Sequence, residues 1–168
     1  VVVPHGVDVK TFNLVSESEK KNIRDKYKIK SEDFILTNIG AMTQNKGVED
    51  LIAAYGILKK KNKNLKLILK DQSNLYDRGA NNPIKNMYDS KFNQKYKIFN
   101  DEMQNDIIII SKNLSFNELR NIYSITDCYV SPYKAEGFNL TPLEAAACGT
   151  QIVVTDGGPT DDYFDDCM

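Results

Sequence analysis

The chain has 168 residues, a length that suits one domain with a core of its own. Hydrophobic residues make up 41% of the sequence and charged residues 27%, the balance of an ordinary soluble globular protein. The formal net charge of −1 gives no electrostatic reason to expect nucleic acid or an anionic membrane surface as a partner, and no apolar run is long enough to span a bilayer.

The first half of the chain alternates helix and strand patterns. In chain order these are a polar helix over 16–27, a strand over 34–39, a polar loop over 40–47, an amphipathic helix over 48–60 and a strand over 65–69. The first helix opens on Ser16 and Glu19, which have the spacing of a capping box. The first strand is almost wholly apolar, which is typical of a parallel sheet covered on both faces.

The second half continues the alternation after an atypical stretch. In chain order it holds an irregular polar segment over 71–105 with a helix around 82–94, a strand over 107–110, a helix over 115–124, a strand over 127–131, a helix opening at 141 and a strand over 151–155. Ser115 and Glu118 form another capping-box pattern. This alternation predicts an α/β fold, a Rossmann-like parallel sheet with helices on both faces.

Ligands of such sheets bind beyond the carboxyl ends of the strands. Three predicted loops leave those ends, at 40–47, 133–140 and 156–160. We therefore expect these loops to converge on one cleft.

The segment from Ser131 to Gly149 sets two carboxylates, Glu136 and Glu144, on either side of a predicted helix start. Thr141 is a good N-cap residue, Pro142 suits the first helical position, and Glu144 completes a capping box with Thr141. A helix N-terminus after a glycine-containing loop attracts anions, because unpaired N–H groups and the positive dipole end point at one place. Carboxylates on both sides are placed to accept hydrogen bonds from hydroxyl groups. Phosphate flanked by hydroxyls describes a sugar nucleotide.

Both ends of the chain resemble interrupted elements. Residues 1–4 read as a strand already in progress, and residues 164–168 stop where a helix is expected to begin. We therefore expect a fragment of a longer protein.

The three cysteines, Cys128, Cys148 and Cys167, match no metal-ligand spacing. The first falls in a predicted strand and the second on a predicted helix, so we expect both to be buried, reduced thiols. This usage favours a cytoplasmic compartment.

A metal site is not expected. The acidic cluster near the C-terminus has no Asp-x-Asp arrangement and reads as the N-terminal charges of a helix; it consists of Asp161, Asp162, Asp165 and Asp166.

Four stretches together resemble the C-terminal, donor-binding domain of retaining glycosyltransferases of the GT-B fold, the large family 4 group. They are Val3 to Asp8, Asn38 to Gly47, Glu118 to Asp127, and Ser131 to Asp161 with its Glu-x7-Glu spacing. The resemblance implies that residues 1–168 form a single nucleotide-sugar-binding domain that lacks the N-terminal acceptor domain and the extreme C-terminal part.

The same resemblance implies roles for individual residues. Glu136 would lie beside the donor sugar as the catalytic glutamate, and Glu144 would bind the ribose hydroxyls. Lys46 would neutralise the diphosphate, and Gly40 would also contact the donor. The diphosphate would be lined by the residues of the loop between the glutamates, namely Gly137, Phe138, Asn139, Leu140 and Thr141. No cofactor or metal is implied. The partners would be a nucleotide sugar and an acceptor glycan, lipid or protein.

The chain departs from the family pattern at several positions. Ala41 stands where an arginine is usual, and Lys70, at the end of its strand, is a candidate to replace that cation. Asn139 stands where glycine is common, and asparagine tolerates unusual backbone angles better than most residues. Gln151 replaces a common proline.

Simpler interpretations remain open at this point. Glu144 could serve only its capping box, Glu136 could be merely solvated, and Lys46 could be a surface lysine before a helix. Gly157 and Gly158 suit either a turn or a ligand contact. Alternatives to sugar transfer are epimerisation or phosphorolysis on a similar fold, and a non-catalytic sugar-nucleotide-binding module, which the missing arginine favours.

Overall fold

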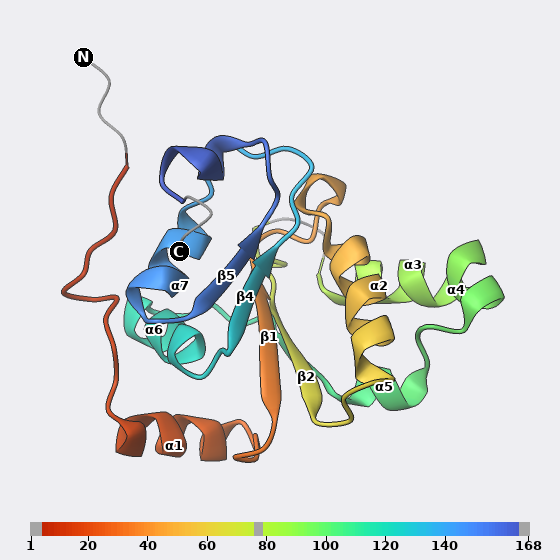
Figure 1. Ribbon diagram of the computed structural model, residues 1–168, viewed down its shortest axis with the longest axis horizontal. Coiled ribbons are helices and arrows are strands. Elements are labelled where there is room, and N and C mark those ends of the chain that lie inside the picture. Colours follow the sequence, from red (N-terminus) through yellow and green to blue (C-terminus); the bar gives the residue numbers. More distant parts are fainter. Residues whose placement is uncertain (1–4, 76–78, 165–168) are drawn as a thin grey trace.

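The computed structural model describes residues 5–75 and 79–164. Its centre is a five-stranded sheet in the order β3-β2-β1-β4-β5, and every pairing in it is parallel (Figure 1). The strands are β1 (Phe34–Ile39), β2 (Leu65–Lys70), β3 (Ile107–Ile110), β4 (Cys128–Ser131) and β5 (Gln151–Val154). The chain reverses its direction of winding between β1 and β4, so the crevice beyond these two strands is a topological switch point.

Helices cover both faces of the sheet, as predicted (Figure 1). One layer holds α2 (Val48–Lys59), α3 (Asn81–Asp89), α4 (Lys91–Tyr96) and α5 (Asp101–Asn105). The opposite layer holds α1 (Glu17–Lys26), α6 (Phe116–Ser124) and α7 (Leu140–Ala147). No helix in the described ranges has both the length and the apolar character needed to cross a membrane.

Two hydrophobic cores result, one on each side of the sheet. Alternate residues of a strand face opposite sides, so Leu36 packs under α2 while Ile35 and Ile39 pack toward α6 and α7. Both faces of the sheet are covered by packed helices, which explains why the strands are rich in apolar residues. The Rossmann-like α/β prediction is therefore confirmed.

The helix starts predicted at Ser16 and Ser115 are confirmed, with one qualification. Ser115 and Glu118 form the complete capping box. Ser16 accepts a hydrogen bond from the backbone N–H of Glu19, but the Glu19 carboxylate pairs with Arg120 at 3.0 Å, so the first capping box is only half formed.

The prediction of a mostly irregular segment over 71–105 was wrong. It holds three helices, α3 to α5, and the predicted helix over 82–94 is divided at Ser90. Ser90 is extended, with ψ of 145°, and its hydroxyl caps α4 by accepting from the N–H of Asn93 at 3.0 Å. Ile84 and Met87 are buried on one side of α3. Tertiary packing therefore stabilises a segment whose intrinsic helix propensity is low.

The predicted start of α7, with Thr141 as N-cap and Pro142 in the first helical position, was also wrong. The helix begins at Leu140 after Asn139, whose backbone is left-handed with φ of 68°, and no side chain caps its first turn. Pro142 therefore lies in the third helical position. The strand predicted within residues 1–4, the helix expected after 164, and Asp165, Asp166 and Cys167 fall outside the described residues.

Candidate functional site

The three predicted loops meet at the carboxyl edge of the sheet. The carbonyl of Asn45, in the loop after β1, accepts the backbone N–H of Lys134, in the loop after β4, at 2.7 Å. The hydroxyl of Tyr133 lies 2.7 Å from that of Thr160, which belongs to the third loop. Residues distant in sequence are thereby gathered beyond the switch point of the sheet.

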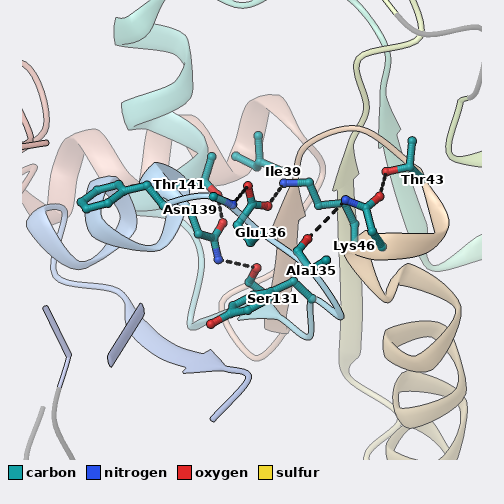
Figure 2. A network of polar contacts seen from close by, with 12 residues as sticks. Ile39, Thr43, Lys46, Ser131, Ala135, Glu136, Asn139 and Thr141 are labelled. Carbon is teal, nitrogen blue, oxygen red and sulfur yellow. Dashed lines mark hydrogen bonds and ion pairs between the residues drawn. The ribbon is translucent and has the colours of Figure 1, made fainter. Parts of the chain in front are cut away.

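An ion pair joins the first two loops. The ammonium of Lys46, at the end of a short 3-10 turn, contacts the carboxylate of Glu136 (Figure 2). The other carboxylate oxygen, Oε1, accepts the backbone N–H of Gly137 at 3.1 Å. The side chains of Lys46 and Glu136 retain 25% and 17% of their exposure, so both remain within reach of a ligand. The ammonium suits an anion and the carboxylate suits a hydroxyl group.

The loop after Glu136 has a fixed, unusual conformation. The Asn139 amide nitrogen donates to the hydroxyl of Ser131 at 3.0 Å, and the hydroxyl of Tyr163 donates to the carbonyls of Phe138 and Asn139 at 2.9 and 2.6 Å. These bonds hold the left-handed backbone of Asn139, as the sequence suggested for a residue replacing glycine. They also leave the first turn of α7 without a side-chain cap, so its N–H groups can bind an anion.

The predicted capping box between Thr141 and Glu144 does not form, because two buried tyrosines take both side chains. The hydroxyl of Tyr129 donates to Thr141 Oγ1 at 2.8 Å. The hydroxyl of Tyr123 donates to Glu144 Oε2 at 2.7 Å. Burial raises the pKa of Glu144 above 4.5, and the Tyr123 hydrogen bond opposes that rise. Among the described residues Glu144 Oε1 has no partner, so one carboxylate oxygen is available to a ligand.

Replacing Tyr123 by phenylalanine should raise the pKa of Glu144 further, because the hydrogen bond that favours the carboxylate is lost. A carboxyl group with a raised folded-state pKa contributes most to stability below its ordinary pKa of 4.5, and that contribution is lost as the pH rises through the folded-state pKa. Carbon-13 NMR titration of labelled glutamate measures the shift. Tyr96→Phe, an exposed tyrosine on α4, is the control. An unchanged Glu144 titration in Tyr123→Phe would contradict the assigned hydrogen bond.

The tyrosines that shape the site could not be found from the sequence. Tyr123, Tyr129 and Tyr163 lie on three different elements, and each reaches a partner 12 to 25 residues away in the chain. No local pattern identifies such contacts. Gly40, in contrast, lies where it was expected: its N–H donates to the carbonyl of Lys70 at 3.0 Å, which ties the end of β1 to the end of β2.

Three further features were compared with the predictions for the site. A cleft of about 650 Å³ lies beside the loop after β1, against α3, with Thr43, Gln44 and Lys134 in its wall. Neither Glu136 nor Glu144 lines this cleft. Within residues 5–75 and 79–164 no three His, Cys, Asp or Glu side chains are grouped to hold a metal ion. Cys148 is buried and Cys128 is partly buried, and both are free thiols.

A family model described as glycosyl transferases group 1 matches residues 19–167. The chain belongs to this family. A D-inositol 3-phosphate glycosyltransferase of Paenarthrobacter aurescens (strain TC1) is 28% identical over 157 residues, which cover 94% of this chain and 35% of that protein. A mannosylfructose-phosphate synthase of Agrobacterium fabrum (strain C58 / ATCC 33970) is 25% identical over 154 residues, with coverage of 92% and 32%. The chain thus spans about a third of the length of these curated relatives.

Solved structures share the fold. The C-terminal domain of the glycosyl transferase group 1 family protein LpcC from Francisella tularensis matches with a TM-score of 0.69 and 24% identity, covering 96% of this chain and 76% of that one. Anabaena Alr3699/HepE in complex with UDP and glucose matches with a TM-score of 0.72 and 18% identity, covering 95% and 39%. This group 1 chain therefore has the fold of glycosyltransferase domains.

Proposed function

We propose that this group 1 chain is the donor-binding domain of a retaining family 4 glycosyltransferase, which moves a sugar from a nucleoside-diphosphate sugar to an acceptor hydroxyl. One observation carries the proposal. Glu136 of the Lys46–Glu136 ion pair closely precedes, in the chain, the first turn of α7, which has no side-chain cap, and Glu144 of α7 keeps one carboxylate oxygen without a partner among the described residues; these groups suit a sugar, a diphosphate and a ribose in turn. The UDP complexes of Alr3699/HepE, which shares the fold, support a nucleotide-sugar ligand.

Each part of the site has a distinct role in this proposal. Glu136 accepts hydrogen bonds from the donor sugar near the reacting carbon, and Glu144 accepts them from the ribose hydroxyls. The backbone from Gly137 to Thr141, with Gly40 across the cleft, lines the diphosphate. Lys46 leaves its pair with Glu136 and binds phosphate oxygens.

The chemistry that these residues supply is stabilisation of the leaving group. As the bond to the sugar breaks, negative charge grows on the nucleoside diphosphate, and the ammonium of Lys46 and the N-terminus of α7 oppose it. These groups act in place of a metal ion. The acceptor and any general base are assigned to an N-terminal domain of the full-length protein, and the compartment is proposed to be the cytoplasm.

Calorimetric titration of the full-length protein with UDP, GDP and ADP tests this function. At least one should bind, and Glu144→Ala should weaken its binding about tenfold or more, because hydrogen bonds to a charged group contribute about 1.5–3 kcal/mol. Glu17→Ala, in the first turn of α1 at the opposite end of the sheet, is the matched control and should bind normally. If Glu144→Ala binds the nucleotide as tightly as the parent does, the ribose assignment is wrong. If none of the three nucleotides binds to the parent, the proposed function is wrong.

A further inference from the structure

Lys70 is a buried lysine at the carboxyl end of β2, next to the start of the loop after β1. Only 6% of its surface is exposed. Its position follows from the register, since Lys70 pairs with Ile39, the last residue of β1, and its carbonyl accepts the N–H of Gly40. Alternation along β2 puts its side chain on the face of Ile68, which is the face that α6 and α7 cover.

A second buried lysine, Lys59, shows what Lys70 lacks. An ammonium has three N–H donors. Lys59, at 7% exposure, donates to the carbonyls of Lys63 and Leu65 and pairs with the Asp106 carboxylate at 2.6 Å. Lys70 contacts only the carbonyl of Asp71 among the described residues. Two of its donors and its charge are therefore left without a partner there.

The neighbouring carboxylate does not neutralise it. Asp71 accepts hydrogen bonds from the N–H groups of Ser73 and Ala80 and from the hydroxyl of Ser111, at 3.1, 2.9 and 2.8 Å. No ion pair within 4.0 Å joins Lys70 to a described carboxylate. Burial lowers the pKa of Lys70, and the nearby charge of Asp71 offsets part of that effect.

The other lysines along this edge of the sheet are paired. Lys46 contacts Glu136, Lys112 pairs with Glu118 at 3.0 Å, and Lys134 pairs with Asp50 at 3.0 Å. Among the described residues Lys70, unlike these three lysines, has no carboxylate partner. A buried cation in this condition costs stability unless an anion reaches it.

We propose that Lys70 is a second cation for the donor diphosphate, opposite Lys46. The two lysines flank Gly40: a Cβ built at Gly40 would lie 3.9 Å from Lys46 Cε, and the Gly40 N–H binds the Lys70 carbonyl. The flexible stem of Lys70 lets its ammonium turn from the Asp71 carbonyl toward phosphate oxygens. Ala41, which follows Gly40, contributes no charge, so β2 supplies the cation. This inference rests on the proposed function.

The test uses the full-length protein and two variants. Lys70→Met removes the charge at similar volume, and Lys70→Gln also keeps an N–H donor for the Asp71 carbonyl. Calorimetry with UDP, GDP and ADP should show at least tenfold weaker binding by both variants. The melting temperature should stay the same or rise, because a buried charge without a counter-ion has been removed. Lys66→Met, at the other end of β2 and paired with Asp106, is the control and should bind within twofold of the parent.

The possible results separate the two proposals. If the parent binds none of the three nucleotides, the proposed function fails and this inference fails with it. If the parent binds and both Lys70 variants bind within twofold of it, only the inference about Lys70 is overturned. Weak binding together with a lowered melting temperature in both variants would make Lys70 a structural residue and would also overturn it.

Discussion

Replacing Lys46 by methionine is expected to lower the turnover of sugar transfer by the full-length protein about 10²–10³-fold, the usual cost of removing one group that stabilises transition-state charge. The ammonium opposes charge that grows on the leaving diphosphate, so kcat should fall more than donor affinity does. Steady-state rates with a saturating acceptor, together with calorimetric donor affinities, separate the two effects.

Lys134→Met is the matched control for this prediction. Lys134 lies in the facing loop, is 56% exposed and pairs with Asp50, so its loss should change turnover less than about twofold. Adding Glu136→Gln completes a double-mutant cycle. Because Lys46 and Glu136 touch, the two changes should not be additive. Turnover in Lys46→Met equal to that of Lys134→Met would remove Lys46 from the reaction.

Replacing Gly47 by alanine is expected to lower the free energy of unfolding by about 3 kcal/mol, from two effects that combine. Gly47 has φ of +65°, and an added Cβ would lie 1.9 Å from the backbone carbonyl oxygen of Pro132. The carbonyl cannot yield without separating the loops after β1 and β4. Urea denaturation measures the loss, and nucleotide affinity should fall with it because Lys46 would move away from Glu136.

Two other glycines divide this effect into its parts. Gly157 also has a positive φ, +79°, but open space around it, so Gly157→Ala should cost about 1 kcal/mol for the backbone angle alone. Gly137 has open space and no positive φ, so Gly137→Ala should be close to neutral in stability. If Gly47→Ala costs no more than Gly157→Ala, the close contact with Pro132 does not constrain the two loops.

The sheet could be predicted from the sequence because its signal is local. Each strand is a short apolar run, since both faces of a parallel sheet are buried, and the polar loops between runs mark the carboxyl ends. Right-handed crossovers then leave few possible strand orders. The convergence of the loops followed from the rule that ligands of such sheets bind beyond the carboxyl ends of the strands.

The start of α7 could not be predicted in the same way. Thr141, Pro142 and Glu144 have the right spacing for a cap, but buried phenol groups must find hydrogen-bond partners. Tyr129 and Tyr123 reach Thr141 and Glu144 from a neighbouring strand and helix, 12 and 21 residues back in the chain. The hydrogen-bonding requirement of the buried tyrosines overrides the local pattern, and the helix begins two residues earlier than predicted, at Leu140.

The prediction for residues 71–105 was wrong for a related reason. This segment is rich in asparagine, a weak helix former, which gives α3 to α5 little helical propensity. The helices exist because Ile84, Met87 and Met103 pack against the core. The pairing of Lys46 with Glu136 lies equally beyond local patterns, since 90 residues separate them. The strand pattern predicted only that their two loops converge, and the roles of the two residues came from the family resemblance.

The contact between Lys46 and Glu136 also bears on how a nucleotide first approaches the protein. Within this ion pair the charge of Lys46 is balanced by Glu136, and the whole chain carries a net charge of only −1. Lys46 therefore projects little positive potential into solvent, and its long-range steering of an anionic ligand should be weak. Encounter would depend on ordinary diffusion, and attraction would develop at short range, once a phosphate group competes with Glu136 for the ammonium.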